Sequence, residues 1–157
     1  MTGVGKSTYL NSLVNYLLDV EMEDDFRYIL TRDVFRNEKG KSSTTEVKIY
    51  GLPKQGKMKK NIRLIDIPGL GDTGGIQKDK ENLRKIKDRI EKTVPYINLI
   101  VYVFKASDTR VTKEAEYVIG QIMGMFAKDM SANIIFVLTF ADNDEPRVIS
   151  QLKSSFS

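Results

Sequence analysis

A glycine-rich string at the start of the chain runs directly into a helical pattern, and this combination limits the fold more than any other feature. The string is Thr-Gly-Val-Gly-Lys-Ser-Thr, residues 2–8. It matches the end of the pattern G-x-x-x-x-G-K-[ST], whose first glycine would fall one residue before Met1. Beyond it, apolar residues recur at the spacing of a helix with one buried stripe: Leu10, Leu13, Val14, Leu17 and Leu18. The pattern predicts a phosphate-binding loop that opens a helix.

Each residue type in this loop has a chemical reason. Gly3 and Gly5 carry no side chain that would keep phosphate away from the backbone N–H groups. Lys6 is placed to reach the β- and γ-phosphates, and the Ser7 hydroxyl is placed to ligate Mg²⁺. A Gly-Lys-Ser string also occurs by chance at helix starts, so other motifs must support the interpretation. The residues predicted to bind the cofactor here are Gly3, Val4, Gly5, Lys6, Ser7 and Thr8.

A second motif, D-x-x-G, directly follows a predicted strand over residues 62–67. Asp66 at the strand's end can hold Mg²⁺ through water, and the Gly69 N–H can contact a γ-phosphate and sense its loss. An Ile-Pro-Gly sequence after a strand is also common in loops that only end the strand. Its occurrence downstream of the phosphate loop makes chance a poor explanation.

A third motif, Thr139-Phe140-Ala141-Asp142, ends another apolar strand. A carboxylate at Asp142 can accept hydrogen bonds from N1–H and the exocyclic amine of guanine, a pairing that adenine cannot offer. The common form is [NT]-K-x-D, and Phe140 replaces the lysine, so its ring could stack on the base instead. By itself an Asp after a strand is more often a turn or cap residue. Its order after the other motifs favours base recognition over residues 139–142.

Two loops carry the remaining candidates. We assign the polar segment of about residues 31–46 as switch I and prefer Thr44 there as a γ-phosphate-dependent Mg²⁺ ligand. Switch II spans about residues 66–77. It carries Leu70 where many small GTPases have a water-orienting glutamine, and leucine cannot hydrogen-bond to water. The catalytic group is therefore unknown, with Asp72 and Thr73 as weak candidates.

Strand and helix patterns alternate along the chain, which predicts an α/β fold. We expect a hairpin of strands over residues 47–52 and 62–67, and fully apolar strands over residues 99–104 and 134–140. Helical stripes lie between them, one of them with Thr112 as its N-cap. This order predicts a three-layer, mostly parallel sheet with an antiparallel edge hairpin, in a single domain over residues 1–157.

Composition excludes several classes of chemistry. The chain has no cysteine and no histidine, which rules out disulfides, thiolate zinc sites and Ser-His or Cys-His catalysis. No apolar run approaches the roughly 20 residues of a membrane-spanning helix, and a cytoplasmic location is favoured. The net charge of +4 is partly concentrated in the lysine-rich loop 54–60, which is either a solvated hairpin turn or a patch for a partner or an acidic membrane.

Taken in order, these motifs resemble the septin-like and immunity-associated (AIG-type) branch of the P-loop (TRAFAC) GTPases. The resemblance rests on residues 2–8, on Ser-Ser-Thr before Thr45, on Asp-Ile-Pro-Gly-Leu-Gly-Asp-Thr at 66–73 and on Leu-Thr-Phe-Ala-Asp at 138–142. It implies a G domain with strand order 2-3-1-4-5-6 and with GTP or GDP and Mg²⁺ as ligands. It also implies a G-domain homodimer or further domains of a longer parent protein, and no nucleic acid partner; nothing in the sequence demands membrane contact.

Compared with such a domain, we expect the first and last strands to be missing from this chain, and we therefore expect a truncated G domain that is marginally stable or unfolded by itself. The leading hypothesis is a GTP- and Mg²⁺-dependent switch with slow or partner-assisted hydrolysis. The alternative is a non-hydrolysing, nucleotide-dependent dimerisation or scaffold module. A P-loop ATPase or kinase is disfavoured by Asp142, although Phe140 departs from the common guanine-reading pattern.

Overall fold

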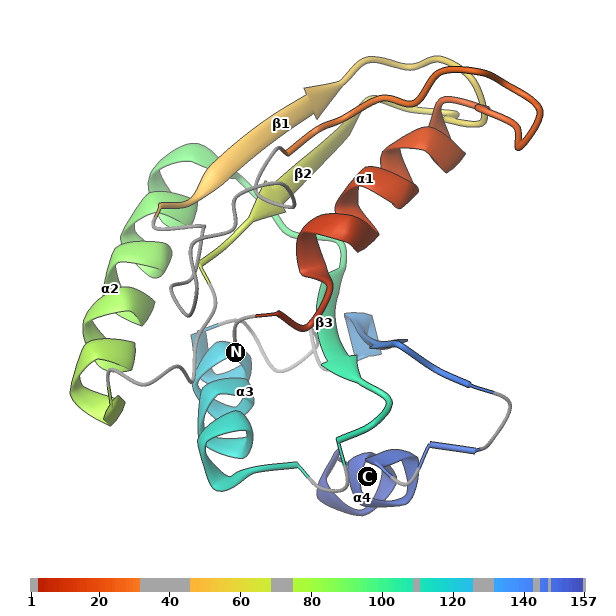
Figure 1. Cartoon of the computed structure of the whole chain (residues 1–157). Helices are drawn as coiled ribbons and strands as arrows, with labels where there is room; N and C mark the ends of the chain where they lie inside the picture. Colours follow the sequence, from red (N-terminus) through yellow and green to blue (C-terminus); the bar gives the residue numbers. More distant parts are fainter. Residues whose placement is uncertain are drawn as a thin grey trace. The chain divides into compact units, whose positions relative to one another are not determined.

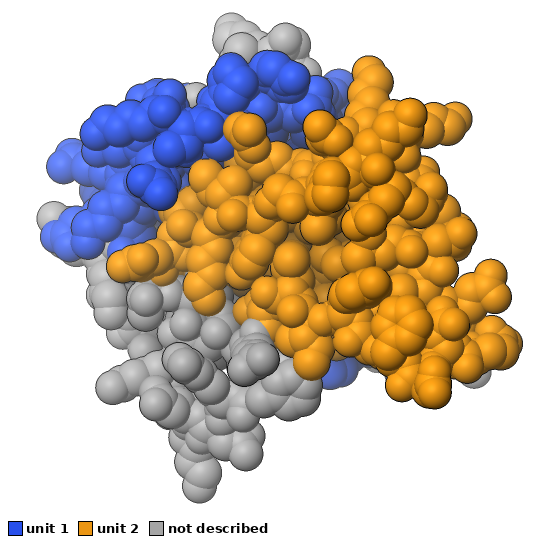
Figure 2. Space-filling model, turned by 90° about the horizontal axis from the view of Figure 1, so that it is seen from above, with its two compact units in different colours: residues 1, 69–157 blue, residues 2–68 orange. Residues whose placement is uncertain are grey.

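The chain is described by a computed structural model that covers residues 3–31, 46–68, 75–108, 111–125, 132–142, 145–146 and 148–156. It contains two compact units, which Figure 2 distinguishes by colour: unit 2 comprises residues 2–68, and unit 1 comprises residue 1 and residues 69–157. The helices and strands of both are labelled in Figure 1. Among the described helices, none combines the length and the hydrophobicity needed to span a bilayer.

Unit 2 contains the predicted helix and the predicted hairpin. Helix α1 spans Lys6–Leu17, and strands β1 (Lys48–Leu52) and β2 (Ile62–Asp66) pair antiparallel, with Lys48 opposite Asp66 and Leu52 opposite Ile62. The hairpin prediction is therefore confirmed. Val14, Leu52 and Met58 form the buried core, and Leu17, Leu18, Leu30, Ile62 and Leu64 pack against it. The helix stripe read from the sequence is the face that packs on the hairpin.

The connection between β1 and β2 is held against the end of α1. Gly56 has a φ of 55°, in the left-handed region, and a Cβ there would lie 2.7 Å from the carbonyl oxygen of Leu17. The next residue, Lys57, donates its backbone N–H to that oxygen at 3.1 Å. Its ammonium lies 2.8 Å from Asp19 Oδ1 and 4.6 Å from the ring centroid of Tyr16. The hydrogen bond to Asp19 raises the pKa of Lys57.

Two asparagines of α1 bind the backbone of the chain that returns along the helix. Asn15 Oδ1 accepts from the Tyr28 N–H and its Nδ2 donates to the Tyr28 carbonyl, both at 2.8 Å. One turn earlier, Asn11 accepts from the N–H groups of Leu30 and Thr31 at 2.9 and 3.0 Å and donates to the Thr31 carbonyl at 3.0 Å. These side-chain amides bind backbone N–H and C=O groups as a neighbouring strand would, so the backbone groups are satisfied without a sheet.

The apolar side chains of this returning segment differ in burial. Phe26, Tyr28 and Ile29 are exposed, whereas Leu30 packs against the core of unit 2. Backbone groups of the segment face α1 because Asn11 and Asn15 bind them.

Unit 1 is built from helices α2 (Gly75–Thr93), α3 (Lys113–Met125) and α4 (Val148–Phe156) and strands β3 (Ile100–Lys105) and β4 (Ile134–Thr139). The two strands pair in parallel, from Ile100 opposite Ile134 to Lys105 opposite Thr139, with α3 as the crossover. The parallel prediction is confirmed, and so is the Thr112 cap, whose Oγ1 accepts from the Ala115 N–H at 3.2 Å.

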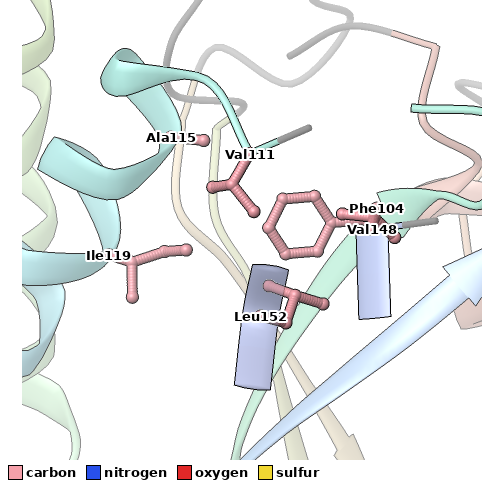
Figure 3. Packing of buried hydrophobic residues seen from close by; sticks show 6 residues of the cluster. All are labelled: Phe104, Val111, Ala115, Ile119, Val148 and Leu152. Atoms are coloured by element: carbon pink, nitrogen blue, oxygen red, sulfur yellow. The ribbon is translucent and has the colours of Figure 1, made fainter. Parts of the chain in front are cut away.

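The core of unit 1 gathers around the Phe104 ring. In Figure 3 this ring faces Val111 and Leu152, and the same cluster contains Ala115, Ile119 and Val148. Helix α4, which supplies Val148 and Leu152, was not predicted from the sequence. The apolar stripe of α2, Leu83, Ile86 and Ile90, is buried, and so is Val94 directly after the helix.

The described strands form two separate pairs, one antiparallel and one parallel. This is an α/β architecture in which a parallel strand pair is crossed by a helix and an antiparallel hairpin packs on another helix. The apolar strand β4 is less covered than its composition suggests, since Ile135 is 42% exposed. The single-domain boundaries proposed from the sequence stay a prediction.

Two glycines of the hairpin provide a matched test of this packing. Gly56→Ala should lower the free energy of unfolding by about 2 kcal/mol, because a left-handed alanine is strained and its Cβ would press on the Leu17 carbonyl. Gly51→Ala, in β1, should raise it by up to about 1 kcal/mol, because a methyl group there would meet nothing within 4 Å. Chemical denaturation measures both. Equal effects of the two substitutions would contradict the docking of the connection on α1.

Candidate functional site

The glycine string folds as a left-handed loop that opens α1. Gly3 and Gly5 have φ values of 76° and 81°, which L-residues with side chains rarely adopt. Gly5 is the N-cap; no side chain caps the helix there, and the Gly5 carbonyl accepts from the Tyr9 N–H at 2.8 Å. The first turn contains no acidic residue. The partial positive charge of the helix start is therefore suited to an anion.

Lys6 joins this loop to the end of β2. Its Nζ lies 3.3 Å from Asp66 Oδ1 and donates a hydrogen bond to the carbonyl oxygen of Ile67. The Asp66 side chain is fully buried, whereas that of Lys6 is 27% exposed. The two motifs that the sequence analysis connected only by order are thus in contact, and Lys6 is the cation that faces the buried carboxylate.

Asp66 has spare hydrogen-bonding capacity. Neither carboxylate oxygen has a hydrogen-bond partner in the described part of the chain, which is unusual for a buried carboxylate. Such oxygens fit water molecules of a hydrated Mg²⁺, and Ser7 is half-buried in the first turn of α1. Within the described ranges, no three Asp, Glu, His or Cys side chains form a metal cluster. The residues therefore suit a cation that phosphate oxygens and water also ligate, as Mg²⁺ on a nucleotide is.

The motif predicted to read the base, residues 139–142, lies in unit 1 at the end of β4. Thr139 Oγ1 donates to the Phe104 carbonyl at 2.9 Å, and the Thr139 carbonyl accepts from the Ala106 N–H at 2.7 Å, so this residue ties together the ends of β3 and β4. Phe140 follows with a φ of 54° and is 68% exposed. Asp142 is exposed as well. The strand end thus presents a ring and a carboxylate to solvent.

Lys105 was missed by the sequence analysis. Its ammonium lies 5.9 Å from the centroid of the Phe140 ring, within the range of a cation–π contact. It ends β3 opposite Thr139, so parallel pairing brings it to the motif. The only signal in the sequence is a lysine that closes an otherwise apolar strand.

Several predicted site residues lie outside the described residues: Thr44, Gly69, Leu70, Asp72 and Thr73. Their roles stay predictions. Of the others, Gly3 to Thr8 and Asp66 lie in unit 2, and Thr139, Phe140 and Asp142 lie in unit 1.

A left-handed glycine loop at a helix start, a lysine from that helix on a strand-end aspartate, and an α/β frame are together typical of a P-loop nucleotide-binding domain. More specifically, the chain belongs to the AIG1 family, whose family model matches residues 1–154. This agrees with the AIG-type resemblance that the motifs indicated.

The fold is similar to that of a solved structure. A crystal structure of a dimerization-deficient mutant of Toc33 from Arabidopsis thaliana matches with a TM-score of 0.59 and 22% sequence identity. The match covers 98% of this chain and 55% of Toc33, so the chain spans little more than half the length of that protein. At this identity the likeness shows the fold, which supports the predicted G-domain class. No curated protein matches the chain in sequence.

The Lys6–Asp66 contact can be tested without nucleotide. Lys6→Met should lower the free energy of unfolding by about 1–3 kcal/mol, because it leaves a buried carboxylate without a cation. Adding Asp66→Asn should restore part of the loss, since the double variant has no buried charge to compensate. Thermal and chemical denaturation of the nucleotide-free chain measure the cycle, with the exposed Lys59→Met as control. Strictly additive effects would contradict the pairing.

Proposed function

We propose that the chain is the nucleotide-binding part of a GTP- and Mg²⁺-dependent switch with slow or partner-assisted hydrolysis. The observation that carries this proposal is the contact between Lys6 of the phosphate loop and the buried carboxylate of Asp66, whose oxygens accept no hydrogen bond from the residues that the structure describes. A purely structural ion pair would not need the left-handed glycine loop and uncapped helix start beside it. Membership of the AIG1 family supports guanine nucleotide as the ligand.

In this proposal the residues of unit 2 receive the phosphates. The N–H groups after Gly3 and Gly5 donate to phosphate oxygens, and Lys6 exchanges its contacts with Asp66 and the Ile67 carbonyl for the β- and γ-phosphates. Ser7 and Asp66 would hold Mg²⁺, the latter through water, and the ion would neutralise phosphate charge. Because Lys6 leaves the carboxylate, the buried charge requires this second cation.

The residues of unit 1 select the base. Asp142 accepts from the N1–H and exocyclic amine of guanine, and the exposed Phe140 ring covers the base in place of a lysine stem. Thr139 sets the position of both, because its hydroxyl and carbonyl fasten the end of β4 to β3. Lys105 holds the Phe140 ring through its cation–π contact.

The switch itself is assigned to residues outside the described ranges. Thr44 would complete Mg²⁺ coordination and the Gly69 N–H would contact the γ-phosphate, so both contacts would be lost on hydrolysis. Leu70 cannot orient a water molecule, which is the reason to expect slow turnover, with Asp72, Thr73 or a partner supplying the missing group.

Asp142→Asn should move the nucleotide preference from guanine toward xanthine. An asparagine amide can donate to the xanthine 2-carbonyl but no longer accepts both guanine donors, so the GTP-to-XTP affinity ratio should fall by about 100-fold or more. Competition binding with GTP, XTP and ATP measures it, and Asp88→Asn on α2 is the exposed control. Unchanged preference would remove Asp142 from the base site, and a preference of the parent chain for ATP would overturn the assignment to guanine.

The second candidate function is a non-hydrolysing, nucleotide-dependent dimerisation module, and Leu70 is the observation that favours it. Single-turnover hydrolysis of bound GTP, followed over a dilution series, separates the two. A switch assisted by its own partner copy should hydrolyse GTP faster as concentration rises. No turnover at any concentration, with GTP still bound, would favour the dimerisation module.

A further inference from the structure

Unit 2 exposes an unusually apolar surface at the far end of α1 from the phosphate loop. Met22 is 86% exposed, and the other large apolar side chains there are about half or more exposed: Tyr16, Phe26, Tyr28 and Ile29. We call these five residues the apolar patch. Within this set the Phe26 and Tyr28 rings are in edge-to-face contact, with their centroids 5.6 Å apart. Exposed apolar side chains that lie close together mark interaction sites on a protein surface.

The patch is held in shape by hydrogen bonds to its backbone. The Arg27 guanidinium donates to the carbonyls of Met22, Asp24 and Phe26 at 3.1, 2.6 and 2.6 Å. Asp24 Oδ2 accepts from the Glu21 N–H at 2.8 Å, and Asn15 binds both backbone groups of Tyr28. Because these contacts order the segment in advance, a partner would lose little conformational entropy on binding it.

Charges of opposite sign flank the patch. Apart from the paired Asp19 and Lys57, the turn after α1 carries three exposed carboxylates, Glu21, Glu23 and Asp25, and the β1–β2 connection carries three exposed lysines, Lys54, Lys59 and Lys60. The Lys57 contact with the end of α1 brings the connection and the turn to the same end of the helix, as Figure 1 shows. The chain therefore displays two matched, opposite charge groups side by side.

We propose that the apolar patch and its two charge groups form a self-complementary surface that binds a second copy of this chain. Under a two-fold axis, the acidic turn of each copy faces the lysine connection of the other, and the apolar side chains meet between them. Because the surface carries equal numbers of acidic and basic side chains, a second copy can pair with both groups. A wholly basic partner would place positive charge against the lysines of the β1–β2 connection and is therefore disfavoured.

The apolar patch lies away from the phosphate loop, so the pairing proposed here differs from a dimer in which two nucleotide sites face each other. Helix α1 has 12 residues, so its ends are about 18 Å apart at 1.5 Å per residue, and the phosphate loop lies at the opposite end. The pairing does not rest on the proposed function and should persist without nucleotide.

Charge exchange tests the surface in the full chain. Variant A replaces Glu21, Glu23 and Asp25 by lysine, and variant B replaces Lys54, Lys59 and Lys60 by glutamate. Each alone should weaken self-association at least about tenfold, because like charges then face each other. An equimolar mixture of A and B, and a single chain carrying all six changes, should both regain it. Nucleotide-free samples are followed by sedimentation velocity up to about 1 mM protein.

Two controls distinguish the surface from altered net charge or folding. Lys80, Lys85 and Lys92 on α2 are exposed, and their change to glutamate repeats the charge change of variant B elsewhere without weakening association. Phe26→Ser should weaken association without altering charge pairing, and circular dichroism checks the fold of every variant. A monomeric parent chain up to the highest concentration, or association that A and B leave unchanged, would overturn the proposal. Recovery only when nucleotide is added would also overturn it.

Discussion

The contact between Lys6 and the buried carboxylate of Asp66 is the interaction on which the glycine-loop end of unit 2 depends. It joins the first turn of α1 to the last residue of β2, so a helix and a hairpin from distant parts of unit 2 meet at one charged point. A carboxylate in that position is costly without a cation, and Lys6 is the cation that contacts it. A nucleotide bound at this loop would therefore have to displace the contact between Lys6 and Asp66.

Elsewhere in unit 2, residues with left-handed backbone conformation and side-chain amides position the segments around α1. Left-handed glycines open α1 toward an anion, and Gly56 lets the hairpin connection close on the other end of the helix. Asn11 and Asn15 pair with the returning chain as a strand would. One helix thus begins at a left-handed glycine loop and ends beside a hydrogen-bonded segment with exposed apolar side chains.

Much of the fold could be predicted because the relevant signals are local. The stripe of α1, the β1–β2 hairpin and the Thr112 cap each depend on residues within a short stretch of chain. Helix α4 was missed because its apolar residues, Val148 and Leu152, form a short pattern whose burial comes from Phe104 on a distant strand. Lys105 was missed for the same reason, since parallel pairing alone brings it to Phe140.

By itself, the sequence determined the class of protein: three short motifs in order, each with the residue types that phosphate or guanine requires, indicate a P-loop GTPase, and membership of the AIG1 family agrees. Only the tertiary structure decided that Lys6 faces Asp66, that the Asp66 oxygens have no hydrogen-bond partner among the described residues, and that Phe26, Tyr28 and Ile29 are exposed. The physical reason is that motif spacing constrains local backbone shape, whereas burial and charge pairing depend on which distant segments pack together.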